Sequence, residues 1–110
     1  MNKVPGLTKP QLQEIQNILQ NQFKSLSHQI HVFVFGSLAE GGFRPSSDLD
    51  LYFTGTKEFL PRVWAHLEEA FENSSLPFKV DLIDEHQLSP AIKSNIASLK
   101  KILIFPVCSE

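Results

Sequence analysis

The sequence predicts an α/β (α+β) fold in which helices flank a mixed sheet. Segments with helical spacing of apolar residues alternate along the chain with short segments rich in β-branched and aromatic residues, and this alternation is typical of a sheet covered by helices. The chain has 110 residues, of which 42% are hydrophobic and 20% charged, as in a compact globular protein. We therefore expect residues 1–110 to form a single domain.

The first two helices are predicted by start signals that an apolar stripe follows. Thr8 and Gln11 fit a capping box, in which each side chain accepts a hydrogen bond from the backbone N–H of the other residue. Apolar residues at helical spacing then continue from Lys9 to about Lys24. A second helix is expected at about residues 60–72, where Pro61 suits the first turn.

A third helix and a last strand are predicted toward the end of the chain. Ser89 and Pro90 fit the N-cap and the first helical position, and the apolar spacing continues to about Lys100. Lys100 and Lys101 would then lie near the negative, C-terminal end of the helix dipole and interact favourably with it. Residues 102–105 follow as a short strand or extended tail.

Three strands are predicted between these helices. Residues 30–35 form a nearly unbroken apolar run, which predicts a strand buried on both faces. Residues 48–54 and 78–84 supply the other two. Asp81, in the last of them, can join the carboxylates of the preceding strand if the two strands pair. Asp84 is its rival, but it lies on the opposite face near the strand end, where capping or a turn is favoured.

The residues that indicate chemistry are concentrated in residues 33–53, FVFGSLAEGGFRPSSDLDLYF. Successive side chains of a strand point to opposite faces, so Asp48 and Asp50 share one face. Two neighbouring carboxylates repel each other and weaken a strand, whereas Mg²⁺ commonly binds carboxylates together with substrate phosphates. We interpret Asp48 and Asp50 as ligands of Mg²⁺ beside a phosphorylated substrate.

Gly36 and Ser37 follow the apolar run at residues 30–35 and fit a phosphate-binding turn. Glycine lets the backbone approach a ligand closely. If Ser37 begins a helical turn, its free N–H groups and hydroxyl can hold phosphate oxygens. Gly-Ser alone and Asp-x-Asp alone are weak signals, since Asp residues at strand ends commonly belong to turns or caps. The presence of both, in this order after an apolar strand, favours the functional interpretation.

These residues resemble the polymerase-β-like nucleotidyltransferases, and the run GSLAEGGFRPSSDLDL is similar to the minimal nucleotidyltransferase (MNT) domains. The matching positions are Gly36, Ser37, Ala39, Gly41, Arg44, Ser47, Asp48 and Asp50. Leu38 and Glu40 depart from the pattern, because family members often carry basic residues there. The resemblance covers nearly the whole chain and implies a polymerase-β-like nucleotidyltransferase fold.

The resemblance also implies an activity, which is Mg²⁺-dependent transfer of AMP from ATP. The site residues that it implies are the catalytic and metal-binding Asp48, Asp50 and Asp81 and the nucleotide-binding Gly36, Ser37, Arg44 and Ser47. Two Mg²⁺ ions about 4 Å apart would stabilise the attacking and leaving oxygens. Gly36 and Ser37 would hold the β and γ phosphates of the leaving pyrophosphate.

A partner protein is implied as well. Minimal nucleotidyltransferases commonly occur with a separate helical HEPN-type protein, as the antitoxin to its toxin. We expect a hydroxyl of such a partner to be the acceptor, since a chain this short has little surface for an acceptor site of its own. Two alternatives stay open: a catalytically silent binding module that neutralises a partner, and a small-molecule nucleotidyltransferase that a partner subunit completes. The set of three carboxylates favours catalysis over the silent module.

Charge and composition argue against several other classes. The net charge of −2 does not suit charge-driven binding of nucleic acid. No apolar run approaches the ~20 residues of a membrane span, no signal-peptide pattern is present, and the single Cys108 cannot form an internal disulfide. We therefore expect a cytoplasmic protein. The four histidines lack the spacing of a zinc site, so we expect surface or structural roles for them.

Overall fold

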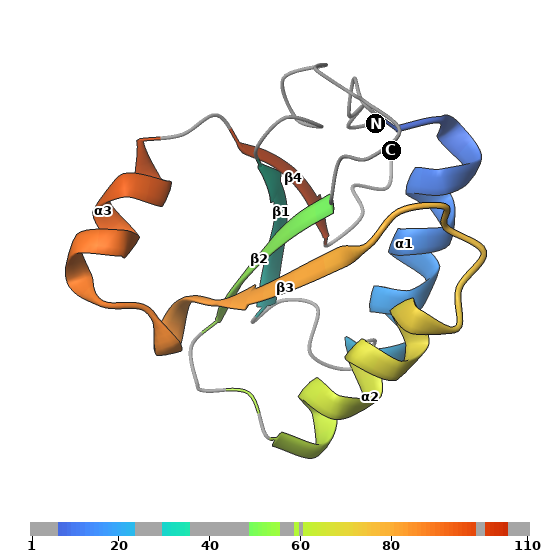
Figure 1. Ribbon diagram of the computed structural model, residues 1–110, viewed down its shortest axis with the longest axis horizontal. Helices are drawn as coiled ribbons and strands as arrows, with labels where there is room; N and C mark the ends of the chain where they lie inside the picture. Colours follow the sequence, from blue (N-terminus) through green and yellow to red (C-terminus); the bar gives the residue numbers. More distant parts are fainter. Residues whose placement is uncertain are drawn as a thin grey trace.

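The computed structural model describes residues 7–23, 30–35, 49–55, 59, 61–98 and 101–105, and Figure 1 shows how their helices and strands are arranged. In chain order the elements are α1 (Lys9–Phe23), β1 (Ile30–Phe35), β2 (Leu49–Gly55), α2 (Pro61–Glu72), β3 (Val80–Asp84), the short 3₁₀ helix η1 (Glu85–Gln87), α3 (Pro90–Ala97) and β4 (Lys101–Phe105). Apart from η1, which was not predicted, this is the order that the sequence predicts, and it confirms the α/β class.

The four strands form one mixed sheet in the order β3-β2-β1-β4. β1 is antiparallel to both of its neighbours, β2 and β4. β2 and β3 run parallel, which requires a crossover connection, and α2 lies in that connection. The crossover places the strand that carries Asp81 directly beside the strand that carries Asp50.

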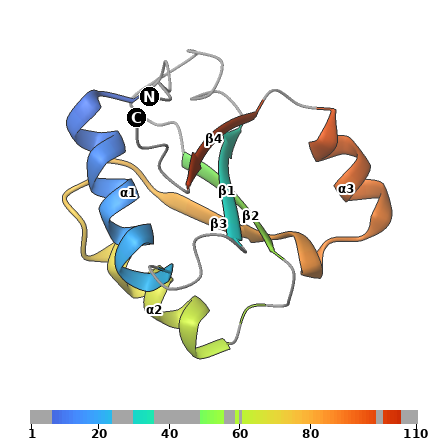
Figure 2. The same ribbon diagram turned by 180° about the vertical axis from the view of Figure 1, so that it is seen from behind.

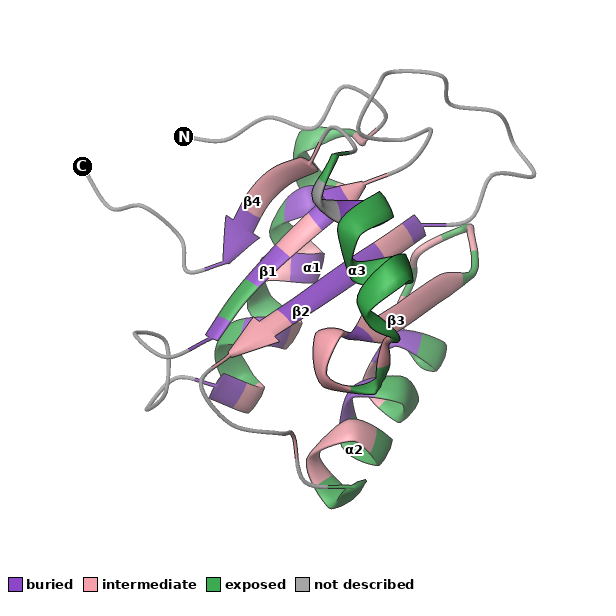
Figure 3. Ribbon diagram, turned by 90° about the vertical axis from the view of Figure 1, so that its left-hand side faces the viewer, coloured by how far each residue is buried: buried purple, intermediate pink, exposed green. Residues whose placement is uncertain are grey.

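The core lies between the sheet and the helices α1 and α2, which cover the same face (Figures 1 and 2). Leu49, Leu51 and Phe53 alternate along β2 and are fully buried, as the period of two in a strand predicts. Burial of a side chain of this size stabilises the fold by about 1.5–3 kcal/mol. We call the opposite face of the sheet the α3 face, because α3 lies on that side (Figure 3).

An aromatic cluster closes the core near the end of β2. The Phe53 ring packs edge-on against Trp64, with ring centroids 5.1 Å apart, and against Phe59, with centroids 6.0 Å apart. Phe23 of α1 meets the same ring at 6.3 Å. Such edge-to-face contacts stabilise by about 0.5–1.5 kcal/mol beyond the area they bury. The cluster therefore holds α1, α2 and β2 together.

The predicted helix caps of α1 and α3 are confirmed. The Thr8 N–H donates to Gln11 Oε1 at 3.0 Å, and the Gln11 N–H donates to Thr8 Oγ1 at 3.3 Å. Ser89 Oγ accepts a hydrogen bond from the Ile92 N–H at 3.4 Å, and Pro90 follows it as the first residue of α3. These side chains satisfy donors that the first helical turn leaves unpaired.

The end of the third helix was predicted too late in the chain. α3 ends at Ala97, because the Ser98 hydroxyl donates to the Asn95 carbonyl at 2.8 Å and so occupies an acceptor of the last turn. Lys101, predicted to lie at the helix terminus, is instead the first residue of β4 and pairs with Phe35. Lys100 lies outside the described residues.

The prediction that β1 is buried on both faces is also wrong. Val32 and Val34 are fully buried under the helices, whereas on the α3 face His31 is exposed and Phe33 and Phe35 are partly buried. α3 is exposed along most of its length (Figure 3), so it does not cover β1 as α1 and α2 do. None of the helices in the described ranges is long and apolar enough to cross a membrane.

Candidate active site

Asp50 on β2 and Asp81 on β3 are direct partners in the register of the parallel pair. Partners in adjacent strands point to the same face. Because Leu49 and Leu51 on either side of Asp50 point into the core, both carboxylates lie on the α3 face, on strands about 4.8 Å apart. The pairing of these two strands, on which the prediction for Asp81 depended, is confirmed.

Lys79 compensates part of the negative charge at this position. Its ammonium lies 3.7 Å from Asp81 Oδ1, with 73% of the Lys79 side chain and 40% of the Asp81 side chain exposed. An ion pair this exposed stabilises by only about 0–1 kcal/mol, so a cation with a stronger preference for carboxylate oxygens can displace the ammonium. The sequence placed both residues on one face but did not identify the ion pair.

The other predicted site residues lie outside the described residues. They are Gly36, Ser37, Arg44, Ser47 and Asp48. The strands that flank residues 36–48, β1 and β2, are nevertheless described. Phe35, which directly precedes the predicted Gly-Ser turn, pairs with Asp50, so the end of β1 lies at the carboxylate pair.

Two carboxylates on one face suit a hard cation. Mg²⁺ is commonly bound through one or two protein carboxylates together with substrate phosphates, and Asp50 and Asp81 supply two such groups at adjacent positions. Within the described ranges, no group of three His, Cys, Asp or Glu side chains is placed to hold a metal ion. Asp48, the third predicted ligand, lies outside those ranges.

Two aromatic side chains, those of Tyr52 and Phe35, lie near the carboxylates on the α3 face. Tyr52, two residues after Asp50, is only 7% exposed and packs edge-on against Phe35, with ring centroids 6.3 Å apart. Burial raises the pKa of the Tyr52 hydroxyl above its ordinary value, and the negative charges of Glu85 and Asp84 raise it further. Tyr52 was not singled out from the sequence, although its spacing from Asp50 places it on the same face.

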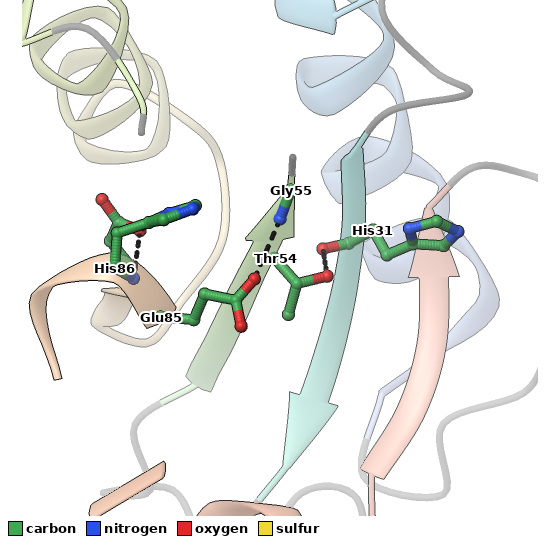
Figure 4. Close-up of polar contacts among 6 residues, drawn as sticks. His31, Thr54, Gly55, Glu85 and His86 are labelled. Carbon is green, nitrogen blue, oxygen red and sulfur yellow. Dashed lines mark hydrogen bonds and ion pairs between the residues drawn. The ribbon is translucent and has the colours of Figure 1, made fainter. Parts of the chain in front are cut away.

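Asp84 has a structural role at the other end of β3. It is the N-cap of η1 and accepts a hydrogen bond from the His86 N–H at 2.9 Å, and His86 Nδ1 lies 3.0 Å from the same oxygen. Glu85 Oε2 accepts from the Gly55 N–H at 3.1 Å (Figure 4). The contact between Glu85 and Gly55 holds the chain after β3 against the end of β2. The contacts of Asp84 with His86 confirm the capping role predicted for Asp84.

A mixed sheet with helices on one face and two carboxylates in register on the other agrees with the fold expected of a nucleotidyltransferase domain. The sequence model of the family described as "Polymerase beta, Nucleotidyltransferase" matches residues 13–105. The chain therefore belongs to the polymerase β nucleotidyltransferase family.

One relative and one solved structure are similar to this chain. "Probable protein adenylyltransferase MntA" of Haemophilus influenzae is 38% identical over 69 residues, which are 61% of this chain and 59% of that protein. The chain thus spans about three fifths of the length of this relative. A structure titled "Crystal structure of the toxin-antitoxin with AMP-PNP" matches with a TM-score of 0.56 at 19% identity, covering 78% of this chain and 70% of the other, and it supports the fold.

Proposed function

We propose that this protein transfers AMP from ATP to a hydroxyl group of a partner protein. The observation that carries the proposal is the register of Asp50 and Asp81 on adjacent parallel strands in a chain of the nucleotidyltransferase family. Paired like charges destabilise a sheet, and a cation bound between them offsets that cost. Asp48, Asp50 and Asp81 are the residues that would hold Mg²⁺, which when bound neutralises charge on phosphate oxygens.

The remaining site residues are proposed to hold the nucleotide. Gly36 and Ser37 bind the β and γ phosphates through backbone N–H groups and the serine hydroxyl. Arg44 presents a fork of donors that suits phosphate oxygens, and Ser47 adds a hydroxyl beside Asp48. The pairing of Phe35 with Asp50 supports this arrangement, because it brings the chain that enters Gly36 to the carboxylates.

The transfer step is an in-line displacement. The acceptor hydroxyl oxygen forms a bond to the α-phosphorus of ATP as the bond from that phosphorus to the pyrophosphate oxygen breaks. Pyrophosphate leaves, and the hydroxyl proton passes to the Asp81 carboxylate. The side chain of Asp81 is 40% exposed, which leaves it accessible to a hydroxyl from another molecule.

Two comparisons support a protein acceptor. The relative from Haemophilus influenzae carries the name of a protein adenylyltransferase, and the similar solved structure is titled as a toxin-antitoxin with the nucleotide analogue AMP-PNP. The resemblance of residues 36–51 to the minimal nucleotidyltransferases implies the rest of the proposal, in which the partner is a helical HEPN-type toxin and this protein is its antitoxin.

Intact-mass analysis of the partner tests the proposal. Co-expression with the product of the adjacent gene should give a partner heavier by one or more AMP units. Asp50→Asn should abolish the added mass without preventing complex formation, and Glu69→Gln, an exposed carboxylate of α2, serves as the matched control. A partner that binds tightly but never gains mass would contradict catalysis and favour a silent binding module.

A further inference from the structure

The outer edge of β3 presents backbone groups that no described residue pairs. β3 is the terminal strand of the sheet, and the Leu49 N–H donates to the Lys79 carbonyl at 2.8 Å. Backbone groups alternate in direction along a strand, so those of Lys79 and Asp81 point to β2, while those of Val80 and Leu82 point outward. Within the described ranges, no backbone hydrogen bond outside the β2–β3 pair reaches Val80 or Leu82.

A groove of about 950 Å³ runs along this edge between β3 and α2. Figure 3 shows β3 at the margin of the sheet with α2 beside it. The groove is lined by β3 itself, by Leu76 and Phe78 ahead of it, and by Glu68, Phe71 and Glu72 of α2. It therefore combines apolar side chains with backbone groups that no described residue pairs, as a surface that accepts an added strand requires.

The charge of the groove indicates which kind of ligand it can bind. Its described lining includes the carboxylates of Asp50, Glu68, Glu72 and Asp81 and one cationic side chain, that of Lys79. This excess of negative charge disfavours nucleic acid and acidic peptides, and it attracts a basic one.

We propose that this groove binds an extended, basic segment of a partner polypeptide, which adds to β3 as a further strand. Backbone hydrogen bonds to Val80 and Leu82 would supply affinity, and basic side chains on one face of the segment would meet Glu68 and Glu72. An unpaired strand edge otherwise exposes a protein to aggregation, so an occupant also protects it.

The alternation of side chains connects this groove to the carboxylates. Residues of the added strand that do not face α2 point to the α3 face, beside Asp81, about 4.8 Å from β3. A Ser, Thr or Tyr at such a position would present its hydroxyl to Asp81 and Asp50, a consequence that rests on the proposed function. Docking itself requires no nucleotide.

The docking is tested with a capped, fluorescein-labelled peptide in which lysine alternates with valine around one central tyrosine. Titration with the full protein in low-salt buffer without nucleotide should give saturable fluorescence anisotropy. Amide hydrogen exchange measured by NMR should slow at Val80 and Leu82, and it should change little at Asp81, whose N–H already points to β2.

A pair of protein variants tests where the peptide binds, and a pair of modified peptides tests whether it binds through backbone hydrogen bonds. Glu68→Lys should weaken binding about fivefold, whereas Glu69→Lys, the same charge change at a neighbouring residue outside the groove lining, should change it by less than about twofold. Two versions of the peptide are N-methylated at alternate residues, so that each keeps every side chain. One version lacks the N–H groups that face β3, and the other lacks those that face away from it. The version without the N–H groups that face β3 should not bind.

Any of four results would overturn the proposal: no saturable binding, equal effects of the Glu68 and Glu69 variants, equal binding of both N-methylated peptides, or unchanged exchange at Val80 and Leu82. Binding of this kind without AMP transfer to any partner would leave the groove assignment standing and contradict only the catalytic proposal.

Discussion

Replacing Asp50 by asparagine should abolish the stabilisation of this fold by Mg²⁺ and ATP. Two unit charges about 5 Å apart interact by about 0.8 kcal/mol in a water-like dielectric and about 3 kcal/mol at an effective dielectric of 20. Because 40% of the Asp81 side chain is exposed, the repulsion between Asp50 and Asp81 lies toward the lower value. The repulsion between the two carboxylates alone is thus about 1 kcal/mol, before the partial compensation by Lys79 is counted.

Ligand binding more than reverses that cost. A ligand at one hundred times its Kd stabilises the native state by about 2.7 kcal/mol, which for a chain of 110 residues raises Tm by about 10 °C. Differential scanning fluorimetry should show this rise for the wild type and for the control Glu69→Gln. In Asp50→Asn the rise should fall below about 2 °C. An undiminished rise in Asp50→Asn would refute the assignment of Asp50 as a metal ligand.

Three further predictions concern the core, the surface and the phosphate site. Phe53→Ala should lower the free energy of unfolding by about 3–5 kcal/mol in urea titration, because its ring is fully buried; a loss below about 1 kcal/mol would contradict the packing described. Hydrogen bonds from the Ser75 hydroxyl and N–H lower the pKa of Glu14 below its ordinary value of 4.5. The stability that Glu14 contributes is therefore present above pH 4.5 and lost as pH falls through the lowered pKa, so the difference in Tm between wild type and Glu14→Gln should shrink over that range and not widen. Ser37→Ala should weaken binding of a non-hydrolysable ATP analogue by about 1.5–3 kcal/mol in isothermal titration, and unchanged affinity would return Ser37 to a structural role.

Local chemistry explains why the helix starts were predictable. The Thr8–Gln11 capping box and the Ser89 cap each involve residues three positions apart, so the sequence itself brings the partners together. Asp84 was assigned to a cap or turn because it lies near the end of its strand on the face opposite Asp81, and in the structure it is the N-cap of η1. The end of α3 was not predictable, because apolar spacing extends past the Ser98 hydroxyl that terminates the helix.

The candidate site depended on information that is not local. Alternation along β2 placed Asp50 opposite the core, but nothing in residues 49–84 specifies that β3 pairs with β2 rather than with β1. The family resemblance supplied that pairing, and the structure has it. The ion pair of Lys79 and the burial of Tyr52 depend on neighbours in space, and the groove depends on which strand ends the sheet, so none of the three could be predicted from spacing.

The position of β3 at the sheet edge gives the carboxylate pair its significance. Two aspartates in register are unfavourable for folding, and a sequence that keeps such a conflict does so most often at a functional site. If β3 were an inner strand, another strand would lie beside Asp81 and only the α3 face would give access to it. At the edge, Asp81 can be reached both from the α3 face and along the strand. Under the proposed function, one carboxylate pair would therefore serve a nucleotide on the face and a polypeptide segment at the edge, and so would hold donor and acceptor at one place.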